Sequence, residues 1–261
     1  MSAGRTGGRA LRRKSGGLAG WGFASVHKRE GDPSAGLAVQ ADAASPQRAS
    51  RERADSLSRI SKAEPAFIPK FGVLAIQGDY DAHAQALREA GAEPVLVRKP
   101  EELASIDGLI IPGGESTTFL KFLERDGFLG ALREFVASKP TFGTCAGCIL
   151  LATEVTHPPQ ASLGVLHATV ERNAYGRQID SSIETADTKL GGGPLEMVYI
   201  RAPRIVKTGD GVTVLAERDG FPVLVEQGHI MAATFHPELS GDRRVHQRFV
   251  DLVRDWPSRQ R

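Results

Sequence analysis

Two short stretches of the sequence hold the side chains best suited to covalent chemistry, and the first contains a cysteine. In Gly143-Thr144-Cys145-Ala146-Gly147 a β-type run ends in small residues and an apolar helical pattern begins at once. That layout is typical of a nucleophile elbow, a sharp turn that raises the nucleophile above the edge of a sheet. A helix N-terminus at this point favours the thiolate over the thiol. We therefore predict that Cys145 is a nucleophile.

The second stretch, Phe235-His236-Pro237-Glu238, follows the last expected strand. Residues two apart in an extended segment face the same way, so His236 and Glu238 are expected to lie side by side, with Pro237 stiffening the link. A thiol, an imidazole and a carboxylate can act as a nucleophile, a general base and the group that holds the base in one tautomer. The sequence therefore predicts a thiol acyl-transfer triad of Cys145, His236 and Glu238.

Acyl transfer also requires hydrogen-bond donors for the oxyanion that develops on the substrate. Two glycines begin the loop Gly113–Thr118 directly after an apolar run, where open α/β sheets place ligand-contacting loops. The backbone N–H groups of Ala146 and Gly114 are the expected donors, each contributing roughly 3 kcal/mol. A purely local use of this loop is a turn in which Ser116 or Thr117 caps a helix, and the two uses are compatible.

The spacing of Cys145 and Cys148 admits other chemistry. A C-x-x-C pair at a helix N-terminus is typical of a redox dithiol, although the strands and glycine loop that precede it do not match a thioredoxin-like plan. A zinc site would need a second pair of thiol or imidazole ligands, and the sequence offers none, so we expect neither a metal nor a cofactor. Cys148 is then expected to be a small buried apolar residue one turn along the helix.

The other histidines after residue 70 have no carboxylate two residues further along the chain, and we expect them to be structural. They are His83, His157, His167, His229 and His246. His246 falls within a closing helical pattern, Arg243–Trp256, and is expected to be exposed.

The elements that must position these side chains alternate between short apolar runs and helical patterns. Buried strands are expected at Phe71–Ile76, Pro94–Val97, Gly108–Ile111 and in the run that Pro140 begins. Helices are expected at Tyr80–Ala90, Phe119–Leu123 and Phe128–Val136, with Asp79 as the N-cap of the first and Gly91 at its end. The alternation predicts a three-layer α/β fold, an open and mostly parallel sheet with helices on both faces.

The second half of the sequence is richer in β-type patterns. Strands are expected at Ser162–Val170, Met197–Ile200, Val212–Ala216, Phe221–Val225 and Ile230–Phe235. The glycine run in Thr188–Pro194 lacks a strand-to-helix setting and is expected to be a flexible loop. Arg172 and Arg177 lie in a polar loop, where each could bind a carboxylate by two parallel hydrogen bonds or be a solvated surface residue.

The basic residues are concentrated at the start of the chain. Residues 1–70 contain 13 Lys or Arg against 6 Asp or Glu, whereas residues 71–261 contain 20 against 25. Residues 1–68 have little apolar periodicity, so we expect a disordered basic extension before a domain over 69–261. Three interpretations of the extension are open: it is an organellar transit peptide, it is a flexible tail, or the start codon is assigned too far upstream.

Composition also bears on partners and location. The body has no basic stripe with interleaved aromatic residues, so we expect no nucleic-acid partner. No run approaches the roughly 18 to 20 apolar residues of a membrane span, so we expect no membrane association. Two cysteines three apart cannot staple a chain of this size, and a thiol nucleophile suits a reducing compartment, so we expect a cytoplasmic protein.

Several motifs together resemble the glutaminase subunit of pyridoxal 5′-phosphate synthase, within the class I glutamine amidotransferases and their flavodoxin-like fold. The triad alone would indicate only that broader class, and the further motifs narrow it. The resemblance spans Phe71 to Trp256 and rests on Leu74–Gly78, Pro112–Thr118, Phe142–Gly147, Val170–Asn173, Gly176–Gln178, Ile200–Pro203 and Phe235–Leu239.

The resemblance implies a reaction, a substrate and a partner. Cys145 would attack the side-chain amide of L-glutamine, releasing ammonia and then glutamate, with His236 and Glu238 assisting. The positions that correspond to the glutamine-binding residues are Gly114, Glu115, Ser116, Arg172, Ile200 and Arg201. The implied partner is the (β/α)₈-barrel synthase subunit, which uses the ammonia to build pyridoxal 5′-phosphate, vitamin B6, within a large hetero-oligomeric ring, and on which glutaminase activity depends.

Two features depart from the resemblance. Cys148 stands where a larger aliphatic residue is usual, and the basic extension has no counterpart in the compact family domain. Three other functions stay open at this point. These are a redox protein that uses both thiols, a non-catalytic docking or regulatory subunit on the same scaffold, and an amidotransferase that serves a different synthase.

Overall fold

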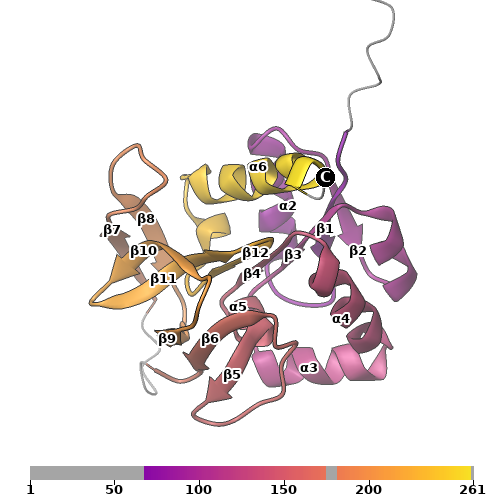
Figure 1. Cartoon of the computed structure of the whole chain (residues 1–261), viewed down its shortest axis with the longest axis horizontal. Helices are drawn as coiled ribbons and strands as arrows, with labels where there is room; N and C mark the ends of the chain where they lie inside the picture. Colours follow the sequence, from indigo (N-terminus) through magenta and orange to yellow (C-terminus); the bar gives the residue numbers. More distant parts are fainter. Residues whose placement is uncertain (1–67, 175–180, 260–261) are drawn as a thin grey trace, which may run out of the picture. The chain divides into compact units, whose positions relative to one another are not determined.

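The computed structural model describes residues 68–174 and 181–259, and it is built around one seven-stranded sheet. The strand order is β10-β11-β12-β4-β3-β1-β2 (Figure 1). The five strands from β12 to β2 are parallel to their neighbours, whereas β11 and β10 are antiparallel. The sheet strands are β1 Phe71–Leu74, β2 Pro94–Val97, β3 Gly108–Ile111, β4 Thr141–Thr144, β10 Thr213–Arg218, β11 Phe221–Gln227 and β12 Ile230–Ala233.

The centre of this sheet is buried on both faces. Every residue of β1, β3, β4 and β12 is buried, while the edge strand β2 is partly exposed. Strands covered on both faces are continuously apolar rather than alternating, and this is why the short runs in the first half of the sequence predict them so well.

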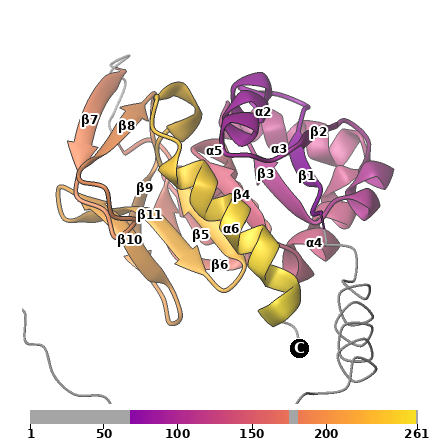
Figure 2. The same ribbon diagram turned by 90° about the horizontal axis from the view of Figure 1, so that it is seen from above.

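Helices cover both faces of the sheet, as the views in Figures 1 and 2 show. One face packs against α2 Tyr80–Glu89 and α6 Arg244–Arg259, through apolar side chains that include Leu87, Phe249 and Val253. The opposite face packs against α3 Ser116–Arg125, α4 Phe128–Ser138 and the 3₁₀ helix η1 Pro100–Ser105. The predicted three-layer α/β fold is therefore confirmed.

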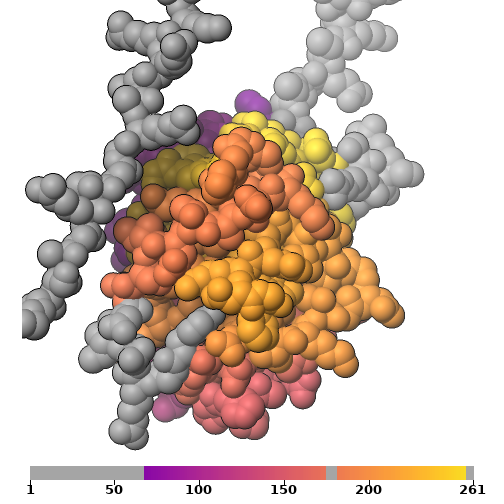
Figure 3. All heavy atoms as spheres, turned by 90° about the vertical axis from the view of Figure 1, so that its left-hand side faces the viewer, coloured from indigo at the N-terminus to yellow at the C-terminus, as the bar shows by residue number. Residues whose placement is uncertain are grey.

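The second half adds two small sheets at the side of the main one. The strands of one, in the order β5-β6-β9, are Ala152–Thr156, Leu166–Glu171 and Arg204–Thr208. The other is the antiparallel pair β7 Ser182–Ala186 and β8 Leu195–Tyr199. Figure 3 looks onto this β-rich side, where orange tones mark β7 to β11. Of these strands, β5, β7 and β9 were not expected from the sequence.

One predicted helix cap is confirmed in position, and the other is wrong. Asp79 is the N-cap residue of α2 as predicted, although its side chain makes no capping hydrogen bond. Helix α3 begins at Ser116, and its N-cap is Glu115, whose carboxylate accepts hydrogen bonds from the backbone N–H groups of Thr117 and Thr118 at 3.0 and 2.6 Å. A carboxylate is the stronger acceptor at a helix N-terminus because it is charged.

The turn after β4 requires two glycines. A Cβ atom on Gly143 would lie 2.6 Å from the carbonyl oxygen of Gly147, and one on Gly147 would collide with the carbonyl oxygen of Ile111 in β3. Helix α5, Ala146–Leu151, can therefore begin immediately above the sheet. Glycine at these two positions is what allows the close approach of α5 to β3 and β4.

Replacing Gly147 by alanine is expected to destabilise the protein by roughly 1 to 3 kcal/mol, the usual cost of overpacking, because the added methyl group meets fixed backbone. Urea unfolding followed by circular dichroism measures the loss. Gly130 provides the control, since it lies in α4 and a Cβ atom there has no neighbour within 4 Å. Gly130→Ala should raise stability by about 0.5 to 1 kcal/mol, and equal stability of the two variants would contradict this account of the elbow.

Candidate active site

The parallel pairing of β4 with β12 brings the two predicted catalytic stretches together. Thr144 at the end of β4 pairs with Ala233 at the end of β12. The N–H of Cys145 then donates to the carbonyl oxygen of Ala233 at 2.9 Å, which extends the ladder by one residue. Because both strands end at the same edge of the sheet, Cys145 and His236 emerge beside each other although they are far apart in the chain.

Cys145 has the backbone of a nucleophile elbow. Its φ is 47° and its ψ is −103°, a positive φ that a residue with a side chain rarely adopts. The residue is only 6% exposed, and its sulfur lies 4.0 Å from the carbonyl oxygen of Ile200, at the outer limit of a thiol hydrogen bond. The thiol therefore faces the segment that follows β8, where Ile200 lies.

His236 and Glu238 meet, but not for the reason expected. The segment is not extended, because Pro237–Leu239 forms the 3₁₀ helix η2 and His236 occupies its N-cap position. Nδ1 of His236 still lies 2.8 Å from Oε1 of Glu238, and the N–H of His236 donates to the carbonyl oxygen of Val198 in β8 at 2.8 Å. Nδ1 therefore carries the proton shared with the carboxylate, and Nε2 is the nitrogen left free to exchange a proton.

Charge stabilises the protonated form of this imidazole. Burial would lower the pKa of His236, but hydrogen bonds to Cys145 and Glu238, together with the charges of both, raise it to about 10. Burial would raise the pKa of Glu238, yet the facing His83 and His236 hold it below its usual range. The arrangement favours an imidazolium beside an ionised carboxylate.

Cys145 and His236 face a pocket of about 540 Å³. Its other lining residues are Gly114, Glu115, Ser116, Ile149, Arg172, Asn173, Ser181, Ile200 and Arg201. All six residues expected at the binding site from the resemblance are among them, and Ile149, Asn173 and Ser181 were not expected. A Cβ atom on Gly113 would lie 2.5 Å from Cε1 of His236, so glycine at this position leaves room for the imidazole.

Arg172 forms one polar wall of this pocket. Its Nη2 donates to Oγ1 of Thr117 at 2.7 Å and lies 3.5 Å from Oε1 of Glu115. Its Nε is buried and has no hydrogen-bond partner within the described part of the chain. Burial opposes the ionisation of Glu115, but hydrogen bonds from Thr118 and Thr117 lower its pKa to about 2. The Glu115 carboxylate thus caps α3 and lies beside Arg172, and Glu115 is also one of the residues that line the pocket.

Not every predicted residue lies in the open pocket. Ala146 is fully buried at the start of α5 and does not line the pocket, while Gly114 lines it with a φ of 135°. Ser116 is nearly buried, and its hydroxyl donates to Oε1 of Gln160 at 3.0 Å. Arg177, the second candidate for carboxylate binding, lies outside the described residues, as do the whole Gly176–Gln178 motif and residues 1–67 of the basic extension.

The two cysteines lie in different surroundings. Cys148 is fully buried in the core with Leu150 and Leu151, so its predicted packing role is confirmed. Burial, together with the nearby Cys145, raises the pKa of the Cys148 thiol far above its ordinary value. A buried thiol of this kind is inert.

The interpretation of the other histidines needs one correction. His246 is fully buried and not exposed, because it lies on the face of α6 that packs against α2. His83 is also fully buried, and its Nε2 lies 3.3 Å from Oε2 of Glu238. By contrast, His167 and His229 hydrogen-bond to backbone carbonyl oxygens, those of Asp210 and Val136.

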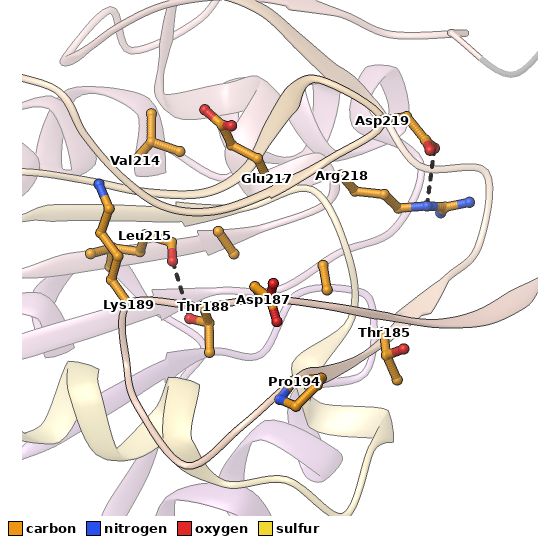
Figure 4. Close-up of a pocket in the computed structure, with 12 residues that line it drawn as sticks. Thr185, Asp187, Thr188, Lys189, Pro194, Val214, Leu215, Glu217, Arg218 and Asp219 are labelled. Carbon is orange, nitrogen blue, oxygen red and sulfur yellow. Dashed lines mark hydrogen bonds and ion pairs between the residues drawn. The ribbon is translucent and has the colours of Figure 1, made fainter.

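A second, more open pocket lies between the β7–β8 pair and β10 (Figure 4). Its charged lining residues are Asp187, Lys189, Glu217, Arg218 and Asp219. Figure 4 shows Arg218 turned toward Asp219, an ion pair of 3.2 Å. The pocket has neither cysteine nor histidine in its lining, so its side chains include no counterpart of the Cys145–His236 pair.

Among the helices of residues 68–174 and 181–259, none is long and apolar enough to cross a membrane. Over the same residues, no three His, Cys, Asp or Glu side chains are grouped as ligands of one metal ion.

Comparisons with known proteins agree with this geometry. The model of the SNO glutamine amidotransferase family matches residues 73–255. A protein of Koribacter versatilis named pyridoxal 5′-phosphate synthase subunit PdxT is 61% identical over 189 residues, which cover 72% of this chain and 98% of that protein. A protein of the same name from Solibacter usitatus is 52% identical over 190 residues, covering 70% of this chain and 99% of that protein.

A solved structure extends the agreement to the fold. A crystal structure of a glutamine amidotransferase is 47% identical in sequence and superposes with a TM-score of 0.66, covering 70% of this chain and 98% of that one. The resemblance expected from the motifs is confirmed. The chain belongs to the SNO glutamine amidotransferase family.

Proposed function

We propose that this chain is the glutaminase subunit of a pyridoxal 5′-phosphate synthase, which hydrolyses L-glutamine and passes the ammonia to a synthase subunit. The observation that carries the proposal is that Cys145 and His236 line one pocket, while Glu238, buried behind it, holds Nδ1 of His236 at 2.8 Å from its Oε1. The relatives from Koribacter and Solibacter are named as subunits of pyridoxal 5′-phosphate synthase, and this supports the proposed assembly.

In the first half of the reaction Cys145 attacks glutamine. The thiolate sulfur forms a bond to the side-chain amide carbon, and a tetrahedral intermediate bears the negative charge on oxygen. The N–H groups of Gly114 and Ala146 are the proposed donors to that oxygen. When the C–N bond breaks, the imidazolium of His236 gives its Nε2 proton to the leaving nitrogen, so ammonia departs and a γ-glutamyl thioester remains.

In the second half water replaces the thiol. Neutral His236 takes a proton from water as the oxygen attacks the thioester carbon, and the C–S bond then breaks. Glutamate leaves, and the thiolate and the imidazolium are restored. Glu238 stays ionised throughout, because its part is to hold Nδ1 of His236 and to stabilise the positive charge on the ring.

The pocket provides for the amino-acid end of glutamine. Arg172 is the proposed partner of the α-carboxylate, because its guanidinium faces the pocket and its Nε lacks a hydrogen-bond partner in the described part of the chain. Glu115, Ser116, Ile200 and Arg201 complete the proposed contact set. An isolated thiol without such a wall would have no means to select an amino acid.

The remaining parts of the proposal concern context. Residues 69–261 are taken as the catalytic domain, with the basic residues 1–68 as an extension outside it. The proposed partner is the (β/α)₈-barrel synthase subunit in a large ring assembly, which would receive the ammonia directly and stimulate glutamine hydrolysis. The proposed location is the cytoplasm, since reducing surroundings suit a thiol nucleophile.

Single cysteine variants separate amide hydrolysis from dithiol redox chemistry. Cys145→Ala should abolish glutamate release measured with the synthase subunit present, because it removes the attacking sulfur. Cys148→Ala should keep most of the activity, because this thiol is buried in the core away from the pocket. Equal loss in both variants, with both chains folded, would favour the redox function instead.

The pH dependence of glutamate release should follow His236. Its pKa of about 10 lies above the ordinary 6.5, so the imidazolium persists at neutral pH and is lost only as the pH rises through about 10. Glu238→Gln removes the charge that supports it, so the alkaline limb should move to lower pH and kcat should fall by roughly 10²- to 10⁴-fold. An alkaline limb unchanged in Glu238→Gln would remove Glu238 from the proposed triad.

Arg172→Lys tests the proposed carboxylate contact. Lysine keeps the charge but not the planar fork, so KM for glutamine should rise at least about tenfold while kcat changes little. The matched control is Arg133→Lys, which makes the same exchange at an exposed position of α4. A KM equal to that of the control would show that Arg172 does not bind the substrate.

A further inference from the structure

A buried polar cluster lies directly behind the proposed triad. It consists of His83 from α2, Thr144 from the end of β4, Glu238 from η2 and His246 from α6. The side chains of these residues come from four separate elements, and each residue is at most 4% exposed. None of them lines the substrate pocket. A polar cluster in such a place is costly unless its members satisfy one another.

The two oxygens of Glu238 have different partners. Oε1 accepts from Nδ1 of His236 at 2.8 Å. Oε2 lies 3.3 Å from Nε2 of His83, an ion-pair distance, and makes no hydrogen bond within the described residues. The same Nε2 lies 3.1 Å from Oγ1 of Thr144. The second oxygen of the carboxylate therefore depends on His83 for compensation of its charge.

This geometry selects one tautomer for each ring. A carboxylate can only accept, so the proton of neutral His83 belongs on Nε2, which faces Glu238. Nδ1 of His83 is then an acceptor, and Nε2 of His246, 3.1 Å away, must donate to it. Nδ1 of His246 is left as an acceptor, and it has no partner among the described residues. The opposite assignment would direct a ring lone pair at the carboxylate.

Both rings are suited to act as neutral donors. Burial lowers the pKa of His83 against the opposing charges of Glu238 and Asp79, and His236 adds to the lowering. Burial also lowers the pKa of His246 well below its ordinary value, helped by His83 and Arg243. Asp79 and Arg243 directly precede α2 and α6, and His236 directly precedes η2, which holds Glu238. Among the described residues these are the charged and titratable groups that act on the two rings. A neutral donor fixes a carboxylate without competing with His236 for the proton.

We infer that His83 is a positioning residue for the proposed glutaminase reaction: its Nε2–H, placed against Oε2 of Glu238 and within hydrogen-bond distance of Thr144, compensates the charge of that oxygen, and His246 holds His83 in the tautomer that does so. The inference rests on the proposed function of the Cys145 site. Its physical content is that Glu238 can keep His236 aligned only while both carboxylate oxygens are restrained. A histidine that merely filled space in the core would not need its proton on a particular nitrogen.

Amide variants of His83 test which nitrogen matters. The side-chain nitrogen of glutamine reaches the position of Nε2, whereas that of asparagine reaches only the position of Nδ1. With the synthase subunit present, His83→Gln should keep kcat within a few-fold of the unmodified chain. His83→Asn should lower kcat by roughly 10- to 100-fold, the usual loss when a group that orients a catalytic ligand is removed. KM for glutamine should stay unchanged in both, because His83 does not touch the pocket.

The pH profile gives a second readout that a packing role would not change. In His83→Asn the less restrained carboxylate supports the imidazolium less well, so the alkaline limb should move to lower pH by about one unit. His229→Asn is the matched control. His229 is partly buried and donates from Nε2 to the carbonyl oxygen of Val136 at 2.9 Å, away from the pocket, so its loss should leave the profile in place.

The outcomes separate the two proposals. If the unmodified chain with its synthase subunit releases no glutamate, the proposed function fails. If the unmodified chain is active and the Gln and Asn variants share the same kcat and the same alkaline limb, the positioning role of His83 is overturned. Thermal unfolding of both variants, which carry amides of similar size, shows whether a difference in folded fraction accounts for a difference in rate. A rise in KM instead of a fall in kcat also contradicts the inference.

Discussion

The parallel pairing of β4 with β12 is the constraint on which the candidate site depends. These strands are adjacent in the sheet although the whole β-rich second half separates them in the chain. Their register, Thr144 opposite Ala233, decides that Cys145 and His236 emerge at the same edge. A shift of one residue would turn the side chains of β12 to the opposite face and carry His236 away from the sulfur. The strands are fully buried, which makes that register costly to change.

The same edge of the sheet also contains a buried charged group, the carboxylate of Glu238. Glu238 is 4% exposed and borders both the imidazole that it is proposed to assist and the fully buried His83. A carboxylate in such surroundings is stable only when its oxygens are compensated, so the helices α2 and α6 do more than cover the sheet. They bring neutral ring donors to a charge that β12 alone could not support. Packing and electrostatics are therefore linked through the two histidines.

The sequence predicts this protein unevenly, for physical reasons. Strands β2 and β3 match the predicted bounds because each is a short apolar run. Strand β7, Ser182–Ala186, has no fully buried residue, so its sequence lacks the apolar pattern that marks a strand. The pair His236 and Glu238 was predicted, but through an extended segment rather than the 3₁₀ helix η2. His83 gave no local signal, because the carboxylate that it faces is 155 residues further along the chain and only the fold brings them together.

Two thiols one helical turn apart show why spacing alone is a weak guide to reactivity. Cys145 stands in a strained turn, beside a buried imidazole and open to the pocket. Cys148 points into the apolar layer formed with Leu150 and Leu151, where burial raises its pKa. A redox pair would need both sulfurs at one accessible surface, and helix α5 instead directs them to different surroundings. The chemistry of the C-x-x-C stretch is thus decided by the sheet beneath it and the imidazole that β12 delivers.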